Sequence, residues 1–222
     1  AIVAGIAAAY AFSHEGELDR DVIFDYAAQL EGHPDNVAPA VYGGMTVSWT
    51  QPGDGVVQPD GTAPAARFRS VNYLVGPDVT ASVFIPDFEL STSKAREALP
   101  TVVPFADAVF NVSRAALLIG AMNPAVLTSP RDPNDLLMEA TEDKLHQAYR
   151  GPLMEPSARL ITLLRANGFA AMVSGAGPCV LVLHNGDADS AIDAVAHEQL
   201  ESRHWKVLHL ATDTQGVQVA RL

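Results

Sequence analysis

Residues 167–185, NGFAAMVSGAGPCVLVLHN, contain two short apolar runs separated by a turn rich in glycine. The runs at residues 169–174 and 179–184 predict two β-strands, because each is short, apolar and bounded by turn residues. The residues between them, Gly175-Ala176-Gly177-Pro178, predict a tight connection. An antiparallel strand pair in a chain that also carries long helical patterns is typical of the α+β class.

Outward from this strand pair, apolar residues recur mostly at helical spacing. We expect helices over residues 1–12, 19–30, 93–99, 104–122, 134–149, 155–167 and 187–203, with Asp19 and Gly32 as the end signals of the second. We expect further strands over residues 45–50, 67–75, 79–86, 207–211 and 218–221, and irregular segments over residues 31–44 and 51–64. The pattern changes between residues 87 and 104, so we predict two domains, residues 1–90 and 91–222.

The composition is that of an acidic, folded protein. The chain has 222 residues, 14 Lys and Arg against 26 Asp and Glu, a net charge of −12 and 48% hydrophobic residues. This argues against disorder and against a general nucleic-acid binder, which normally carries a basic surface. The one cysteine, Cys179, cannot form an internal disulfide, so nothing here indicates an oxidising compartment.

No apolar run reaches the roughly 18 residues that a membrane helix requires. The nearest, AIVAGIAAAYAF at residues 1–12, has neither the basic region nor the initiator methionine of a secretion signal. We interpret it as a buried, alanine-rich helix, and we expect that the chain begins inside an element whose upstream part is missing. We expect a cytoplasmic protein without membrane or nucleic-acid partners.

Residues 31–36, EGHPDN, concentrate polar side chains between a predicted helix and an apolar strand. Gly32 and Pro34 favour an irregular backbone, which lets the polar side chains point the same way. The residues alone also fit a helix end followed by an Asx-turn. A metal site is a weaker interpretation, because no second histidine cluster accompanies His33 and Asp35.

Two further features suit a small anion. The SGAGP turn at residues 174–178 lets backbone N–H groups approach a ligand, although such turns also join strands without binding anything. It is not a Walker loop, because no Lys-Ser/Thr pair follows it. Arg96, four residues after Thr92, and Arg150 lie at predicted helix ends. Each can bind a carboxylate or phosphate through its fork, and the plainer alternative for each is a solvated charge beside a helix.

Taken together, four segments resemble the homoserine kinase family of the GHMP kinase superfamily. They are EGHPDNVAPAVYGG (31–44), LSTSKAREALP (90–100), LHQAYRGPLMEP (145–156) and SGAGPCVLVL (174–183), in the family's order. The resemblance implies a two-domain α+β fold, with part of a ribosomal-protein-S5-like N-terminal domain and a ferredoxin-like C-terminal domain. The family's ATP phosphate loop, of the form PxxxGLGSSA, does not occur in this sequence. We therefore expect a chain that lacks the N-terminal part containing that loop.

The resemblance also implies an activity and a role for each candidate residue. The activity is transfer of the ATP γ-phosphoryl group to the hydroxyl of L-homoserine, which gives O-phospho-L-homoserine in threonine biosynthesis and requires ATP and Mg²⁺. The implied catalytic residues are Glu31, as the Mg²⁺ ligand, Asp35, Asn36 and Arg150. The implied substrate-binding residues are His33, Asp35 and Asn36 at the ammonium and hydroxyl, Thr92, Arg96 and Arg150 at the α-carboxylate, and Gly175 and Gly177 in the closing turn. Proton transfer to Asp35 and a base-free route, in which the proton passes to the phosphate, both stay open.

Two alternatives to this function stay open as well. Another GHMP kinase, acting on mevalonate or a sugar, would share the glycine-rich turn, whereas the arginine pair and residues 33–36 favour an amino acid. A non-catalytic GHMP-fold protein that binds a small metabolite is the second alternative, and the absent phosphate loop is its main support. A homodimer is compatible with the main function and with both alternatives, because the loss of N-terminal strands would leave a sheet edge and apolar surface exposed.

Overall fold

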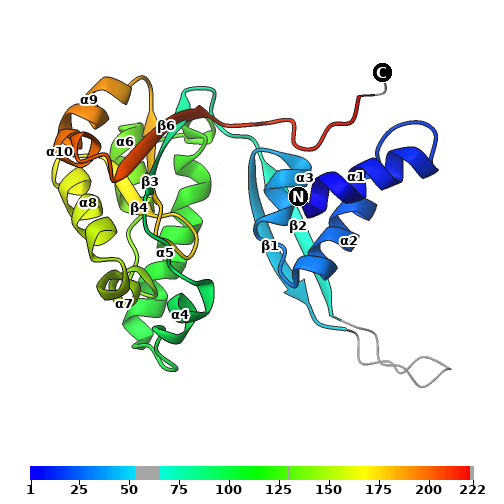
Figure 1. Cartoon of the computed structure of the whole chain (residues 1–222), viewed down its shortest axis with the longest axis horizontal. Helices are drawn as coiled ribbons and strands as arrows, with labels where there is room; N and C mark the ends of the chain where they lie inside the picture. Colours follow the sequence, from blue (N-terminus) through cyan, green and yellow to red (C-terminus); the bar gives the residue numbers. More distant parts are fainter. Residues whose placement is uncertain (54–65, 130, 221–222) are drawn as a thin grey trace. The chain divides into compact units, whose positions relative to one another are not determined.

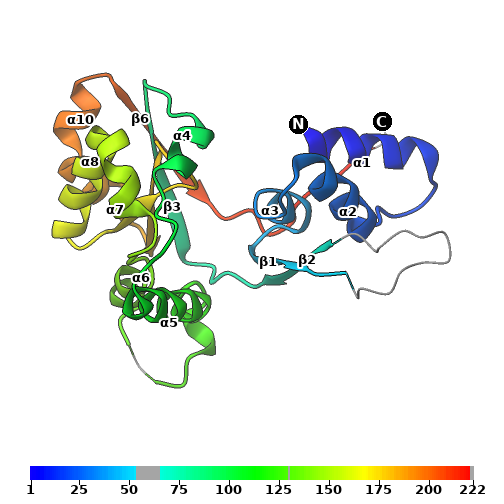
Figure 2. The ribbon, with the colours of Figure 1, turned by 90° about the horizontal axis from the view of Figure 1, so that it is seen from below.

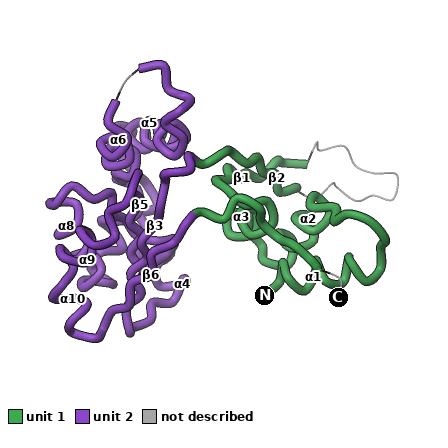
Figure 3. Tube along the Cα trace, turned by 90° about the horizontal axis from the view of Figure 1, so that it is seen from above, with its two compact units in different colours: residues 1–75, 212–222 green, residues 76–211 purple. Residues whose placement is uncertain are grey.

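A computed structural model describes residues 1–53, 66–129 and 131–220. The chain forms two compact units, one comprising Ala1–Val75 with Thr212–Leu222 and the other comprising Gly76–Ala211 (Figure 3). These units divide the chain after residues 75 and 211, whereas the predicted family domains divide it after residue 90. The assignment of the family domains stays a prediction. The loop predicted for residues 51–64 lies, beyond residue 53, outside the described residues.

The first unit packs three helices against a two-stranded antiparallel hairpin (Figure 1). The helices are α1 (Ile2–Ser13), α2 (Arg20–Glu31) and α3 (Val37–Tyr42), and the strands are β1 (Met45–Gln51) and β2 (Arg67–Tyr73). Asp19 caps α2 by accepting a hydrogen bond from Val22 N, and Gly32 ends the helix, as predicted. The buried core of this unit consists of Ala7, Ile23, Phe24, Ala27, Ala28, Val37, Ala38 and Val41.

The second unit is built on a four-stranded antiparallel sheet with the strand order β4-β5-β3-β6. Its strands are β3 (Val79–Pro86), β4 (Ala170–Val173), β5 (Val180–Asn185) and β6 (Trp205–Ala211). Helices follow β3 and β5 along the chain, which gives the β-α-β-β-α-β succession of ferredoxin-like folds. The predicted α+β class is therefore confirmed, and β4 and β5 are the strand pair that residues 167–185 predict.

Helices cover both faces of this sheet (Figure 2). The helices α8 (Glu155–Ala166), α9 (Asp189–Val195) and α10 (His197–Glu201) pack on one face, and α5 (Phe105–Ala121) and α6 (Pro133–Ala140) pack on the other. Successive side chains of β5 point to opposite faces of the sheet and so contact both helical layers. Val180 and Val182 lie in the core with α8, whereas Leu183 lies in the core with α6. Shorter elements complete the unit: α4 (Thr92–Glu97), α7 (Gln147–Arg150) and the 3₁₀ turns η1 (Pro124–Val126) and η2 (Gly151–Leu153).

Two side chains satisfy backbone groups of β4, the strand at one edge of the sheet. Arg165 of α8 donates to Ala171 O at 3.1 Å and to Met138 O of α6 at 2.7 Å. Gln147 Oε1 of α7 accepts from Val173 N at 2.8 Å. Because α8 and α6 lie on opposite faces, Arg165 links the two helical layers around the edge of the sheet. The edge strand is thereby closed to further strand pairing.

Two predictions of a single long helix were wrong, because each segment forms two shorter helices. The predicted helix over residues 134–149 is two helices, α6 and α7, because Asp143 accepts hydrogen bonds from the backbone N–H groups of His146 and Gln147 and so starts α7 separately. The predicted helix over residues 187–203 is divided into α9 and α10 at Ala196, which is fully buried in the core.

Two further segments differ from their predictions. Residues 37–42 form α3 inside the segment predicted to be irregular, because Val37, Ala38 and Val41 are buried in the core of the first unit. The predicted strand over residues 218–221 is absent from residues 218–220, since the C-terminal segment makes isolated backbone bonds, such as Val217 N to Val41 O, rather than a ladder. Residue 221 lies outside the described ranges. None of the helices within those ranges is both long and apolar enough to span a membrane.

Candidate functional site

The polar segment at residues 31–36 lies between two helices of the first unit. Glu31 is the last residue of α2 and Asn36 immediately precedes α3, so a helix end fixes each side of the segment. His33 Nδ1 lies 2.6 Å from Asp35 Oδ1, and His33 Nε2 lies 4.0 Å from Glu31 Oε1. Asn36 N also donates to Asp35 Oδ1 at 3.2 Å, a local bond of the turn. The imidazole therefore stands between two carboxylates, and the Asp35 side chain stays 76% exposed.

Glu31 is the residue of this segment that the resemblance assigns to magnesium. Among the described residues, no group of three or more His, Cys, Asp or Glu side chains is arranged to hold a metal ion. Mg²⁺ is commonly bound by one or two carboxylates together with water and substrate phosphates. The Glu31 carboxylate is 37% exposed at a helix end. Its oxygen chemistry and exposure suit such a shared site.

Thr92 and Arg96 lie on α4 in the second unit. Ser91 caps this helix, because its Oγ accepts a hydrogen bond from Lys94 N at 3.2 Å. Residues four apart share a helix face, so Thr92 and Arg96 lie on the same side of α4. Both are exposed, whereas Ala95 between them is buried. This helix therefore presents a hydroxyl group and a guanidinium group together.

The glycine-rich turn joins β4 to β5. Ser174 N donates to Cys179 O and Gly177 N donates to Ser174 O, both at 2.9 Å. Gly177 has a φ of 87°, and a Cβ there would lie 2.5 Å from Met154 Sδ, so the position suits only glycine. Gly175 is exposed, and nothing lies within 4 Å of its Cβ position. The turn is thus packed on one side and open at Gly175.

Arg150 connects α4, α7 and the glycine-rich turn. Its Nε donates to Ala95 O at 3.2 Å, and its Nη1 donates to Gly175 O at 3.1 Å and lies 3.3 Å from His146 Nδ1. The candidate segments of the second unit are therefore brought together around one guanidinium. Within the described residues, Nη2 is the nitrogen that these contacts leave for an anion. A carboxylate bound through two nitrogens would have to displace one of the existing bonds.

The residues that hold α7 were missed by the sequence analysis. Asp143 accepts hydrogen bonds from Gln147 N at 2.7 Å and His146 N at 2.9 Å. Burial raises the pKa of Asp143, but these bonds outweigh burial and hold the pKa below its ordinary value. Burial lowers the pKa of His146, against the attraction of Asp143. Asp143 lies four positions before Gln147, the first residue of α7, rather than next to the helix where a capping residue is expected, so no local signal identified it.

Acid is expected to weaken the fold through His146 and Asp143. The folded pKa of His146 lies below its ordinary value of 6.5, so the unfolded chain binds more protons near that pH and stability falls as the pH drops. Asp143 also lowers stability in acid, but at a lower pH. Its carboxylate contributes fully to stability above its ordinary pKa of 3.8, and this contribution is lost as the pH falls through the lower pKa of the folded state.

His146→Gln should therefore flatten the loss of unfolding free energy between about pH 7 and about pH 5, as measured by urea titration. His197→Gln is the matched control, because it makes the same substitution at an exposed imidazole of α10, away from Asp143 and α7. A slope in His146→Gln equal to that of the unmodified chain would contradict this origin of the pH dependence.

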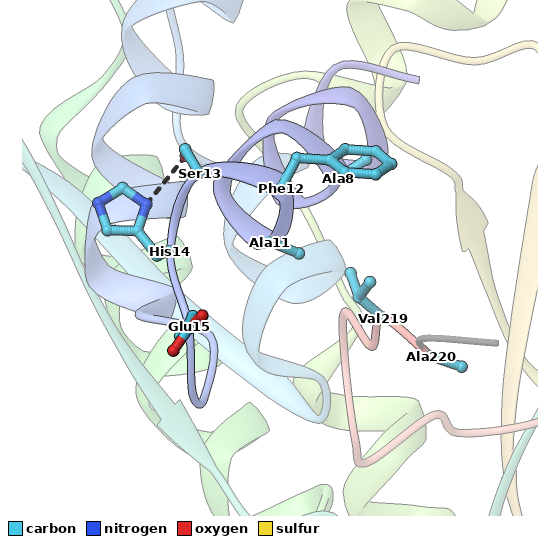
Figure 4. Close-up of a pocket in the computed structure, with 8 residues that line it drawn as sticks. All are labelled: Ala8, Ala11, Phe12, Ser13, His14, Glu15, Val219 and Ala220. Carbon is cyan, nitrogen blue, oxygen red and sulfur yellow. Dashed lines mark hydrogen bonds between the residues drawn. The ribbon is translucent and has the colours of Figure 1, made fainter.

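Two of the cavities in the described part of the chain contain none of the predicted site residues. One of about 770 Å³ in the first unit lies between the end of α1 and the C-terminal segment (Figure 4). Its lining residues are Ala8, Ala11, Phe12, Ser13, His14, Glu15, Val219 and Ala220, none of which was predicted as a site residue. Another of about 380 Å³ adjoins α7 through Gln147 and Ala148 and is also lined by Met154 and Val173. Hydrogen-bonded segments, rather than either cavity, define the candidate site.

The chain is similar to known proteins in sequence. Residues 122–201 match the family model described as GHMP kinases C terminal. The chain is 44% identical over 223 residues to a homoserine kinase of Leifsonia xyli subsp. xyli, with 100% of this chain and 62% of that protein covered. It is 40% identical over 224 residues to a homoserine kinase of Streptomyces coelicolor, with 100% of this chain and 64% of that protein covered. The chain thus spans less than two thirds of the length of these relatives.

A solved structure shares the fold. The crystal structure of a homoserine kinase from Cytophaga hutchinsonii superposes with a TM-score of 0.76 at 20% identity, covering 96% of this chain and 64% of that chain. At this identity the superposition shows the fold alone. The chain is therefore similar in sequence to homoserine kinases along its whole length, and residues 122–201 match the GHMP kinase C-terminal model.

Proposed function

We propose that this chain carries the homoserine-binding residues of a homoserine kinase, which transfers the γ-phosphoryl group of ATP to the side-chain hydroxyl of L-homoserine. The product, O-phospho-L-homoserine, belongs to threonine biosynthesis. One observation carries the proposal. Arg150 joins α4, which bears Thr92 and Arg96, to the glycine-rich turn through bonds to Ala95 O and Gly175 O. The names of the sequence relatives, which are homoserine kinases, support the substrate class.

The α-carboxylate of homoserine is assigned to the second unit. Arg96 offers an exposed guanidinium, Arg150 offers Nη2, and Thr92 offers a hydroxyl on the same side of α4 as Arg96. Arg96 follows Ala95, whose carbonyl oxygen Arg150 contacts, and in a chain with a net charge of −12 two cations assigned to this region would attract an anion locally. The backbone at Gly175 and Gly177 closes this part of the site.

The ammonium and hydroxyl of homoserine are assigned to the first unit. The Asp35 carboxylate is exposed enough to pair with an ammonium, and His33 Nδ1 lies 2.6 Å from its Oδ1. Asn36 is assigned to the hydroxyl. A carboxylate that already pairs with a cation is a weaker base. A route in which the hydroxyl proton passes to the phosphate therefore suits this site as well as proton transfer to Asp35.

ATP supplies the phosphoryl group, and Mg²⁺, when bound, neutralises phosphate charge. Glu31 is the carboxylate that we assign to Mg²⁺ from this chain, in a site completed by phosphate oxygens and water. The chain's own residues mainly bind and orient the acceptor, and such positioning accounts for much of the catalysis of phosphoryl transfer.

The proposal is tested by ADP release with L-homoserine, mevalonate and galactose as separate acceptors. Because the chain spans 62% of the Leifsonia relative, the assay compares it with a chimera that adds the parts of that kinase outside the aligned region. We expect turnover by the chimera with homoserine alone. Turnover with mevalonate or galactose would reassign the substrate class. A folded chimera that is silent with all three, but whose 222-residue part binds homoserine in calorimetry, would favour a non-catalytic binding protein.

Arg96→Ala is expected to raise the homoserine KM of the active chimera by about 10-fold or more, because one charge-assisted hydrogen bond contributes about 1.5–3 kcal/mol. The ATP KM should hardly change. Arg131→Ala is the control, since Arg131 is 55% exposed and pairs with Glu139 of α6. Equal increases in both KM values for Arg96→Ala would contradict its assignment to the carboxylate.

A further inference from the structure

Arg150 lies on a helix that is too short to be stable by itself. The helix α7 has four residues, and a single helical turn fixes several backbone angles for few hydrogen bonds. Arg150 N donates to His146 O at 3.0 Å, and Arg150 Nη1 lies 3.3 Å from His146 Nδ1. The position of the guanidinium therefore follows that of His146, and His146 must be held from outside α7.

The Asp143 carboxylate holds the start of α7. Its Oδ2 accepts from His146 N at 2.9 Å and Gln147 N at 2.7 Å, and its Oδ1 accepts from Leu145 N at 3.2 Å. His146 Nε2 lies 3.7 Å from Oδ1, and the Asp143 side chain is only 6% exposed. The backbone N–H groups therefore supply most of the stabilisation of this buried charge. One carboxylate fixes the backbone from which Arg150 extends.

Asn111 connects this carboxylate to a long helix. Asn111 Nδ2 donates to Asp143 Oδ1 at 2.7 Å, and Asn111 Oδ1 accepts from Lys144 N at 2.8 Å. Asn111 belongs to α5, which has 17 residues and contributes to the core on one face of the sheet. A continuous series of contacts thus runs from α5 through Asn111, Asp143 and His146 to the Arg150 guanidinium.

We infer that Asp143, held by Asn111, is a positioning residue for Arg150 and thereby sets the affinity for the homoserine carboxylate. The inference rests on the proposed function, because it takes Arg150 to bind that carboxylate. Asp143→Asn is the sharpest substitution. The side chain keeps its shape, but its NH₂ group must face a donor, either Asn111 Nδ2 or the N–H groups of α7.

Asp143→Asn is expected to raise the homoserine KM about 10-fold in the ADP-release assay, with the ATP KM nearly unchanged. In an Arg150→Ala background the same substitution should leave the homoserine KM unchanged, which a merely structural role would not produce. Asp132→Asn is the matched control. Asp132 caps α6 by accepting from Asn134 N at 2.8 Å and Asp135 N at 3.3 Å, and α6 bears no candidate residue. The Asp132→Asn variant should keep the homoserine KM of the unmodified chimera.

Asn111→Ala gives a second test if Asp143→Asn does not fold, because it removes the bonds to Asp143 and Lys144 and should raise the homoserine KM several-fold. An unchanged homoserine KM in the folded variants, beside a raised KM in Arg150→Ala, would overturn this inference alone. An unchanged KM in Arg150→Ala would overturn the proposed role of Arg150, and this inference with it.

Discussion

Arg150→Ala is expected to weaken the binding of L-homoserine by roughly 30- to 150-fold, or about 2–3 kcal/mol. The substitution removes a cation assigned to the carboxylate. It also removes the bonds from Arg150 to Ala95 O and Gly175 O, so that α4 and the glycine-rich turn lose their common support. The effect should therefore exceed that of Arg96→Ala, which removes a side chain exposed at one helix only. The homoserine KM of the chimera and the dissociation constant from calorimetry measure it.

Two variants make this result specific. Arg150→Lys keeps the charge, but an ammonium cannot reproduce the planar set of donors that contacts Ala95 O and Gly175 O, so its binding should be intermediate. Arg159→Ala removes an arginine of α8 that is 65% exposed and pairs with Glu155. It should bind homoserine as the unmodified chain does. Normal binding by a folded Arg150→Ala variant would remove the proposed carboxylate site from this unit.

Local signals predicted the elements whose ends are set by neighbouring residues. Asp19 and Gly32 mark the two ends of α2 as expected, and the glycine-rich turn joins β4 to β5 as expected. The break between α6 and α7 was not predictable in the same way. It depends on Asp143, which is fixed by Asn111 from 32 positions earlier in the chain. A contact across that distance leaves no periodic signal, so the spacing of apolar residues suggested one continuous helix.

In the candidate site, too, local sequence signals were predictive, whereas contacts between distant segments were not. Residue types and motif order indicated which side chains to examine, and the resemblance supplied their roles. Neither indicated that Nε and Nη1 of Arg150 are already bonded to Ala95 O and Gly175 O, which leaves Nη2 for a ligand. Those partners come from segments distant in the chain, and only folding places them together. The assigned roles of Glu31 and Asp35 stay predictions.

Arg165→Met is expected to lower the free energy of unfolding by about 3 kcal/mol, the upper range for a single substitution. Arg165 donates to Met138 O at 2.7 Å, Thr141 Oγ1 at 2.9 Å and Ala171 O at 3.1 Å. Burial lowers the pKa of Arg165, yet a guanidinium stays charged, so these bonds are charge-assisted. Methionine keeps much of the apolar stem but leaves the two carbonyl oxygens without this donor.

Arg159→Met is the matched control for this prediction, because it changes an exposed arginine on the same helix and should cost less than about 0.5 kcal/mol. Urea unfolding of both variants gives the comparison. Arg165 joins the helical layers on opposite faces of the sheet, so amide exchange in Arg165→Met should accelerate in β4 and at the end of α6 before it does in β6. Equal stability of the two variants would mean that the apolar cores alone hold these layers together, and that the edge of β4 requires no closure by Arg165.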